Sequence, residues 1–332
     1  MNDKVIGKLS DDKSMSCSRL AALIGVSPFS SPNDELKNSI SALGEEFAPS
    51  ELPPDRAMPE VVEIGTEFEN NILRLGAKRL GLYINTNITE RVSSSKINLQ
   101  GSLDGILEGN DQIIKTDHSK GIIVYGDNDE IRLSGPGVAE AKFTTALPSP
   151  EPMPFRGPIQ CQGLQMCTGY KWHVIFTLYG RTGNLVCYIG QQDKSLEYKI
   201  TQEVNRFERK LDIYKKEGSI DYYNPINTND AARTYANAEN ELPPIVLSDE
   251  GSLAANQILL LKKDVKCKTE TIDKLQTYLM SEMGIHTSAV SADNNLRITW
   301  PVNKARDGYV IEARPAARSK TLRLKLIDGG KK

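Results

Sequence analysis

The stretch GVAEAKF, residues 137–143, places two opposite charges inside a short apolar run. Side chains of a β-strand alternate between its two faces, so Glu140 and Lys142 project from the same side. The other residues of the run are typical of a strand that is buried. A charged pair in such a strand predicts that both side chains point into one site.

An acidic residue earlier in the chain gives this pair its context. Asp104 lies in GSLDGIL (101–107), a run expected to form a neighbouring strand that bends at Gly105. Two carboxylates that meet in a dry site repel each other, and neither ionises easily. A divalent cation relieves this repulsion, and a small set of oxygen ligands selects Mg²⁺, with Mn²⁺ as a substitute.

Lys142 beside these acids would orient or help deprotonate a water, or stabilise charge that develops on a phosphate. Metal, activated water and cation together predict phosphodiester hydrolysis. The alternative is a surface ion pair between Glu140 and Lys142, worth about 0–1 kcal/mol, because an E-x-K pattern also arises by chance.

The composition is that of a soluble globular protein, with 332 residues, 39% hydrophobic and 25% charged. No apolar run approaches the roughly 18 residues of a membrane span, and the first residues lack the apolar region of a secretory signal. Five scattered cysteines without a C-x-x-C suit a reducing cytosol and argue against zinc or iron–sulfur sites. A net charge of −2 means that nucleic acid would be bound through a local patch or metal ions.

Hydrophobic periodicity predicts alternating helices and strands. Helices are expected within 14–29 and over about 61–80, 157–168, 200–218 and 252–283, and a loop over 46–60. Strand patterns fall on five runs within 97–143 and on 172–180, 184–190, 294–302 and 320–326. The polar stretch 221–251 has no periodicity and is predicted to be a linker. It would join a first domain over 1–220 to an appendage over 252–332.

Two helices carry apolar stripes that should face the core. One stripe is Ile64, Phe68, Ile72 and Leu75; the other is Ile200, Val204, Phe207, Leu211 and Tyr214. The 252–283 helix carries a third apolar stripe on one face and charged residues on the opposite face. The stripe consists of Ile258, Leu261, Val265, Ile272, Leu275 and Leu279.

The order of six short motifs resembles that of a known family. They are SCSRLAALIGVSPFSSP (16–32), IGTEFENNIL (64–73), GSLDGI (101–106), AEAKF (139–143), QCQGLQMCTG (160–169) and WHVIFTLYG (172–180). Over roughly residues 14–215 the chain resembles the PD-(D/E)xK nuclease superfamily, and within it the phage-type alkaline exonucleases, namely lambda exonuclease and the YqaJ-like viral recombinases. The resemblance implies an α/β fold with a restriction-endonuclease-like core, a central mixed β-sheet flanked by helices, followed by a C-terminal helical and β appendage.

The resemblance also assigns roles. Asp104, Glu140 and the Ala141 carbonyl would bind Mg²⁺, and Glu69 would hold a second metal or its waters. Lys142 would orient the nucleophilic water, and Gln160 would support the site from its helix. Ser18 and Ser102 would contact the terminal 5′ phosphate.

The implied activity is 5′-to-3′ exonucleolytic digestion of one strand of linear double-stranded DNA, in phage-type recombination or repair. The implied partners are DNA ends, a single-strand annealing protein and further copies of the chain in a ring, commonly a trimer. The setting would be the cytoplasm of a bacterial host, with no membrane contact. A RecB-like or endonucleolytic relative is the alternative within the class, and a catalytically idle DNA-binding assembly protein is the alternative outside it.

The chain departs from the family pattern in two places. The stretch between Asp104 and Glu140 is long, as though an extra hairpin occupied about 111–134. After Lys142 no arginine stands at the expected phosphate-binding spacing, so Arg156 or Arg19 would have to substitute. Gln162, two residues after Gln160, is expected on the helix surface. The basic cluster 314–325 is expected to be a solvated edge strand or, as the alternative, to contact DNA phosphates.

Overall fold

A computed structural model describes residues 14–44, 59–236, 243–292 and 296–300 of the chain. It divides into two compact units, Met1–Tyr235 and Ala236–Lys332, which are described separately below. The predicted strand at 320–326, the basic cluster 314–325 and the predicted loop up to residue 58 lie outside the described residues.

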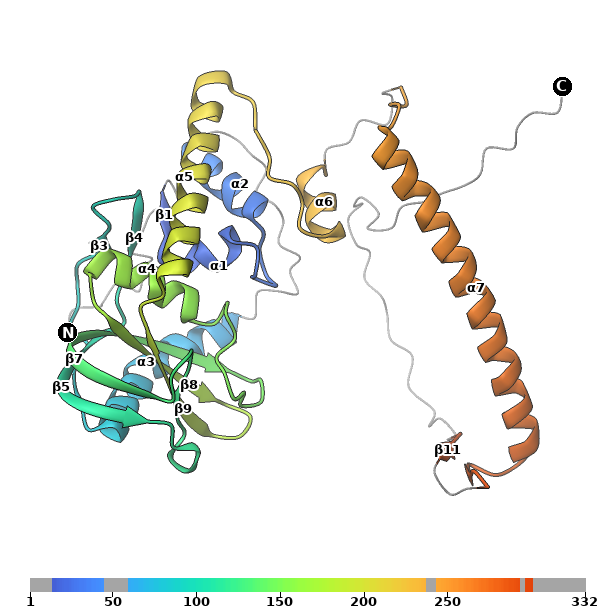
Figure 1. Ribbon diagram of the computed structural model, residues 1–332, viewed down its shortest axis with the longest axis horizontal. Helices are drawn as coiled ribbons and strands as arrows, with labels where there is room; N and C mark the ends of the chain where they lie inside the picture. The colour runs from blue at the N-terminus through green and yellow to red at the C-terminus, as the bar shows by residue number, and fades with distance from the viewer. Residues whose placement is uncertain (1–13, 45–58, 237–242, 293–295, 301–332) are drawn as a thin grey trace. The chain divides into compact units, whose positions relative to one another are not determined.

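The first unit contains most of the secondary structure (Figure 1). Its helices are η1 (Cys17–Arg19), α1 (Leu20–Leu23), α2 (Pro32–Ala42), α3 (Pro59–Leu80), η3 (His118–Lys120), α4 (Pro158–Thr168), α5 (Lys194–Glu217) and α6 (Thr228–Thr234). Its strands are β1 (Met15–Ser16), β2 (Tyr83–Asn85), β3 (Val92–Ser93), β4 (Leu99–Gly101), β5 (Gly105–Lys115), β6 (Ile122–Val124), β7 (Glu130–Thr144), β8 (Trp172–Tyr179) and β9 (Asn184–Gln191).

The centre of this unit is a six-stranded sheet in the order β2-β5-β7-β8-β9-β6. Strand β7 pairs antiparallel with β5 and parallel with β8, so the sheet is mixed, as the sequence predicts. β1, β4 and β3 form a second, three-stranded sheet in that order.

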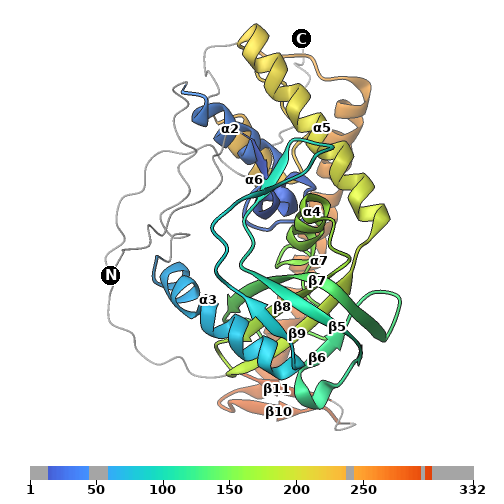
Figure 2. The same ribbon diagram turned by 90° about the vertical axis from the view of Figure 1, so that its left-hand side faces the viewer.

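Helices cover both faces of the central sheet, which gives two hydrophobic cores (Figure 2). On one face α4 packs against β7 and β8, and α1, α2 and α5 pack around α4 and one another in the same core, which includes Val138 and Ile175. On the other face α3 packs against Ala139 and Phe176 of the same strands. The two faces alternate along β7, and Glu140 and Lys142 therefore belong to the α4 face.

The predicted stripe of α5 is confirmed, since all five of its residues are buried. The predicted stripe of α3 is confirmed for Ile72, which is buried, but Ile64, Phe68 and Leu75 are 41%, 46% and 59% exposed. The helix packs on the sheet through its second half, where Ile72, Leu73, Ala77 and Leu80 are buried. Gly76 lies on the same face, and a side chain there would collide with the ring of Phe176.

The structure differs from the separate hairpin that the sequence predicts over about 111–134. Strands β5 and β7 form one long antiparallel pair, from Gly105↔Ala139 to Lys115↔Glu130, with a bulge near Asp111, whose φ is 62°. Between them, β6 pairs in parallel with β9 at the opposite edge of the sheet. The additional residues thus lengthen the two central strands and complete the far edge.

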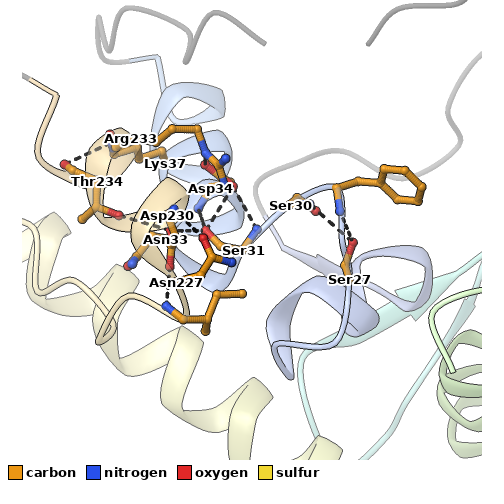
Figure 3. Close-up of polar contacts among 12 residues, drawn as sticks. Ser27, Ser30, Ser31, Asn33, Asp34, Lys37, Asn227, Asp230, Arg233 and Thr234 are labelled. Atoms are coloured by element: carbon orange, nitrogen blue, oxygen red, sulfur yellow. Dashed lines mark hydrogen bonds and ion pairs between the residues drawn. The ribbon is translucent and has the colours of Figure 1, made fainter. Parts of the chain in front are cut away.

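The segment after α5 belongs to the first unit up to Tyr235, beyond the predicted boundary at residue 220. Figure 3 shows the polar contacts that join α2 to α6. The Ser31 hydroxyl donates to Asp230 at 2.5 Å, and the guanidinium of Arg233 contacts both carboxylate oxygens of Asp34 at 3.0 and 2.7 Å. The first part of the predicted linker is therefore structured, through polar contacts that hydrophobic periodicity does not report.

The second unit is built around α7 (Asp249–Met283), followed by the antiparallel strands β10 (Ser288–Val290) and β11 (Arg297–Thr299). The predicted 252–283 helix is confirmed, and its first turn is capped by the Ser248 side chain. None of the helices in the described residues combines the length and apolarity that crossing a bilayer requires.

Candidate active site

The candidate site lies where β5 begins and β7 continues past it. Pairing of the two strands stops at Gly105↔Ala139, and Asp104 stands just before β5. Its Oδ2 accepts a hydrogen bond of 2.9 Å from the backbone N–H of Ala141, in place of the next ladder bond. The N–H and C=O of one strand residue point the same way, so the Ala141 carbonyl also faces the side of Asp104.

Glu140 and Lys142 project from the α4 face of β7 and contact each other. The Lys142 Nζ donates to Glu140 Oε1 at 2.5 Å and to Gln160 Oε1 of α4 at 3.1 Å. The Glu140 side chain is 2% exposed, whereas that of Lys142 is 29% exposed. The ammonium group is therefore held by two acceptors, on a side chain that is partly exposed.

The second oxygen of Glu140, Oε2, is buried and has no hydrogen-bond partner in the described structure. Burial, followed by the charge of Asp104, raises the pKa of Glu140 from 4.5 to about 8, against the lowering effect of Lys142. Burial likewise raises the pKa of Asp104, offset in part by Lys142 and the Ala141 N–H. The two carboxyls lie within interaction range, since each alters the pKa of the other.

The pKa of Lys142 is also raised, which for a lysine favours the charged form. Burial by itself lowers its pKa, but the charges of Glu140 and Asp104 outweigh that effect and raise it. The lysine is accordingly a cation at neutral pH. One ammonium group stands against two carboxyls, which leaves the acidic side of the site short of positive charge.

These residues fit a Mg²⁺-class cation. They offer carboxylate and carbonyl oxygens only, and Glu140 Oε2 is a buried acceptor without a donor. The described residues assemble no cluster of three or more His, Cys, Asp or Glu side chains that could hold a metal.

Glu69 approaches the site from the other face of the sheet. It is half-buried on α3, and its negative charge adds to the rise in the pKa of Glu140. Electrostatic coupling places Glu69 near the acidic pair without showing it as a direct ligand.

Ser18 and Ser102 lie just past the ends of two paired strands. β1 and β4 run parallel, with Ser16 opposite Gln100; Ser18 then lies in η1, and Ser102 follows the end of β4. The backbone at Gly101 also packs against the Cys17 side chain. Ser18 is exposed, and its hydroxyl lies 3.1 Å from that of Ser16. Ser102 precedes Asp104 by two residues, so this edge adjoins the acidic pair.

Arg19 does not join this group. Its side chain is 8% exposed and forms an ion pair with Glu35 of α2, with 2.5 Å between Nε and Oε2. A second guanidinium nitrogen donates to the Glu35 carbonyl at 2.7 Å and to the Ser39 hydroxyl at 2.9 Å. The prediction that Arg19 could bind phosphate is wrong, because its donors are engaged inside the protein.

Arg156 remains a candidate. It donates at 2.6 Å to the hydroxyl of Thr144, which lies on the same face of β7 as Lys142, one alternation further along. Its guanidinium stacks over the ring of Phe155 at 5.3 Å, and its Nε is buried without a hydrogen-bond partner among the described residues.

Two functional neighbours were missed by reasoning from sequence. Thr144 anchors Arg156, and the alternation of β7 after Lys142 could have identified it. Gln162 is buried rather than at the surface: it donates to the Gln191 carbonyl at 2.6 Å and accepts from the Asp193 N–H at 3.0 Å. It ties α4 to the junction of β9 and α5, so the two glutamines of the Q-x-Q motif have separate tasks.

No family model and no curated protein matches the chain. Solved structures similar to it are alkaline and phage-related exonucleases, the class that the sequence motifs resemble. The alkaline exonuclease LHK-Exo from Laribacter hongkongensis is 17% identical, with a TM-score of 0.41, covering 63% of this chain and 94% of its own. LHK-Exo in complex with dAMP gives the same identity and TM-score over 62% and 94%.

A phage-related exonuclease from Haemophilus somnus 129PT is 18% identical, with a TM-score of 0.38, over 62% of this chain and 96% of its own. These similarities are distant, and the function proposed below rests on the geometry of the site.

Proposed function

We propose that this chain is a Mg²⁺-dependent exonuclease that hydrolyses one strand of linear double-stranded DNA from the 5′ end. The observation that carries the proposal is the buried, unpartnered Oε2 of Glu140 beside Asp104, next to the ammonium group of Lys142. A purely structural ion pair would have no reason to leave one buried carboxylate oxygen without a partner.

Metal binding would be the role of the acidic residues and one backbone carbonyl. Asp104, Glu140 and the Ala141 carbonyl would hold the ion, with Mn²⁺ as a substitute, and Glu69 would hold a second ion or its waters. The bound metal supplies an activated water and neutralises charge on the scissile phosphate. Burial of the acidic pair excludes bulk water and strengthens each of these electrostatic interactions.

Lys142 would orient the attacking water and stabilise the phosphate oxygens as their charge grows. Its ammonium is held from two directions, by Glu140 and by Gln160. Gln160 therefore acts as a positioning residue, since it fixes the lysine from α4.

Ser18, Ser102 and Arg156 would recognise the 5′-terminal phosphate. Hydroxyl and guanidinium groups are phosphate donors, Ser102 precedes Asp104 by two residues, and Ser18 follows the strand that pairs with β4. A phosphate held there would present the first phosphodiester bond to the acidic pair. This arrangement favours digestion that starts at a 5′ end.

The same proposal includes the partners that the family resemblance implies. Several copies would form a ring, such as a trimer, around the duplex, and a single-strand annealing protein would coat the exposed strand in recombination or repair. A ring needs positive charge only in its bore, which is compatible with a net charge of −2.

The test is digestion of end-labelled linear duplex and of closed circular duplex, with Mg²⁺ or with EDTA, by the wild type and by Glu140→Gln. We expect mononucleotides from the 5′ end of the linear duplex, intact circles, and no digestion with EDTA or with the variant. Cleavage of circles would replace the exonuclease by an endonuclease. No Mg²⁺-dependent change in either DNA would leave an idle DNA-binding protein.

A further inference from the structure

Two cysteines that are far apart in sequence bring their sulfur atoms into contact within the first unit. The Sγ atoms of Cys17 in η1 and Cys167 in α4 are 4.0 Å apart, and both are free cysteines. Cys17 is buried, whereas Cys167 is only partly buried. A buried cysteine by itself behaves as a small apolar residue. Two facing thiols, one of them partly exposed, form instead a candidate site of reversible oxidation.

Two glycines shape the slot that holds the Cys17 side chain. A Cβ at Gly163 of α4 would lie 3.1 Å from the Cys17 Sγ, and a Cβ at Gly101 of β4 would lie 2.9 Å from it. Gly163 and Cys167 are four residues apart and therefore lie on the same face of α4. The lack of a side chain at Gly163 lets η1 approach this face closely, which brings the two thiols together.

The two sulfur atoms need only a small movement to form a bond. A disulfide bond is about 2.05 Å long, so the atoms must approach each other by about 2 Å. Cys167 lies in the last turn of α4, which ends at Thr168 and is followed by Gly169 with a φ of 80°. Because the carbonyls of a last turn lack partners within the helix, this turn adjusts more easily than the helix interior.

The surroundings of the two thiols give them different roles. A hydrogen bond from the Cys17 thiol, supported by one from the Ser94 N–H, lowers the pKa of Cys167 against the raising effect of burial. Burial raises the pKa of Cys17 well above its usual range. Cys167 is therefore the thiol that ionises and meets a soluble oxidant, and Cys17 is the thiol that then attacks the oxidised sulfur.

We propose that Cys17 and Cys167 form a reversible disulfide when the protein meets a hydroperoxide, and that this bond ties η1 to α4. The Cys167 thiolate attacks one oxygen of hydrogen peroxide; the O–O bond breaks, hydroxide leaves and a sulfenic acid remains. The Cys17 sulfur then attacks the Cys167 sulfur, the S–S bond forms, and the S–O bond breaks with release of water that carries the Cys17 proton. In total two thiols lose two electrons and one peroxide is reduced to two waters.

The disulfide would act on a segment that carries a residue of the candidate site. Ser18 directly follows Cys17 in η1. Closure of the bond draws η1 and the end of α4 together, and Ser18 moves with η1. We expect the oxidised protein to hold a 5′-terminal phosphate less well. This consequence rests on the proposed function, whereas formation of the bond does not.

The first test locates the bond in the full-length protein. It uses a Cys267→Ser background, which removes the exposed thiol of α7. The reduced protein is treated with hydrogen peroxide, its remaining thiols are alkylated, and its tryptic peptides are analysed by mass spectrometry without reduction. We expect the peptide 14–19 to be linked through Cys167 to the peptide 157–171, and dithiothreitol to separate the two.

Cys161 provides a matched control, because it lies in the same tryptic peptide as Cys167 and is buried. Cys161→Ala should retain the link and Cys167→Ser should abolish it, with circular dichroism to verify that both variants are folded. A bond from Cys17 to Cys161, a link that persists in Cys167→Ser, or the absence of any link would overturn the proposal.

The second test concerns the phosphate site. On oxidation, the ratio of digestion rates on phosphorylated and unphosphorylated 5′ ends should fall about fivefold, as for lost hydrogen bonds to a charged group. Dithiothreitol should restore the ratio, and peroxide should not change it in Cys167→Ser. An unchanged ratio in linked protein would overturn the effect on the site. Absence of digestion in both redox states would overturn the nuclease assignment and not the disulfide.

Discussion

Two buried carboxylate–cation pairs in the first unit have similar geometry and different consequences. Arg19 and Glu35 join η1 to α2, and Lys142 and Glu140 lie on β7; in each pair the closest nitrogen and oxygen are 2.5 Å apart. The Arg19 guanidinium continues to a backbone carbonyl and to Ser39, and neither side chain retains a buried unpaired atom among the described residues. Glu140 retains one.

The difference teaches how to separate a structural pair from a functional one. A buried charge is tolerated when each of its hydrogen-bonding atoms has a partner, and it is costly otherwise. Glu140 Oε2 has none within the described protein, and the pKa of the group is raised to about 8. A protein retains such a cost where a ligand supplies the missing interaction, and the ligand proposed here is a cation.

The largest expected effect comes from exchanging the two glutamates for glutamine. Glu140→Gln should lower the rate of digestion of linear duplex about 10³-fold or more, because it removes a proposed metal ligand. Its free energy of unfolding should change little at neutral pH, since the raised pKa of about 8 keeps the Glu140 carboxyl largely protonated and glutamine is similar to that neutral form. Activity with Mg²⁺ and a urea titration would measure both. An active variant would show that Glu140 is no ligand.

Glu35→Gln is the mirror of that variant. Removal of its charge leaves Arg19 buried without a counter-ion, and we expect a loss of about 3–5 kcal/mol in the free energy of unfolding. The folded fraction should digest DNA at close to the wild-type rate. If Glu35→Gln instead behaved like Glu140→Gln, the distinction between the two pairs would be lost.

The next effect is a dependence of metal affinity on pH. The cation requires ionised Glu140, whose pKa is about 8 in the folded protein. The apparent affinity for Mg²⁺ should therefore rise about tenfold per pH unit up to about pH 8, as one proton leaves for each ion bound. Calorimetric titrations between pH 6 and about pH 9 would measure this slope. An affinity independent of pH would contradict the coupling.

The metal-free protein should show the opposite trend in stability. Between 4.5 and about 8, folded Glu140 keeps a proton that the unfolded chain releases. The stability from this group is complete below the unfolded pKa and is lost as pH rises through the folded pKa. Unfolding of Glu140→Gln should lack this decline, which isolates the contribution of the one carboxyl.

A smaller contrast lies within α4. Gln160→Ala should reduce turnover about tenfold with little change in stability, because Lys142 loses one of its two supports. Gln162→Ala should instead lower the free energy of unfolding by about 1–3 kcal/mol, since two buried hydrogen bonds to the β9–α5 junction are lost. Turnover and urea unfolding of both variants would measure the contrast. Equal effects on turnover would argue that both glutamines support the lysine.

The smallest expected effect concerns end preference. Replacing Ser18 and Ser102 together by alanine should lower the ratio of rates on phosphorylated and unphosphorylated 5′ ends about fivefold, through lost hydrogen bonds to a charged group. Competition between the two duplexes would measure the ratio. An unchanged ratio would remove both serines from the phosphate site and leave Arg156 as the candidate.

Hydrophobic periodicity predicted those helices and strands whose buried face consists of large apolar side chains. All five stripe residues of α5 are buried, and the strands with regular alternation are present. It predicted the helix α3 but misplaced most of its buried face, which is formed by Ile72, Leu73 and Leu80 with Gly76 against Phe176, and it did not find α2. It also read 221–235 as linker, because Ser31, Asp230 and their neighbours hold that segment by polar contacts between distant parts of the chain.

The sequence by itself determined which residues could form the site. Strand alternation puts Glu140 and Lys142 on one side, and the Q-x-Q motif supplies Gln160, since these are local properties of the chain. Only the tertiary structure decided that Arg19 forms an ion pair with Glu35 and that Gln162 is buried. It also decided that Glu140 Oε2 has no hydrogen-bond partner among the described residues. The reason is physical: whether a polar atom is satisfied depends on groups far away in sequence, which meet it only when the chain is folded.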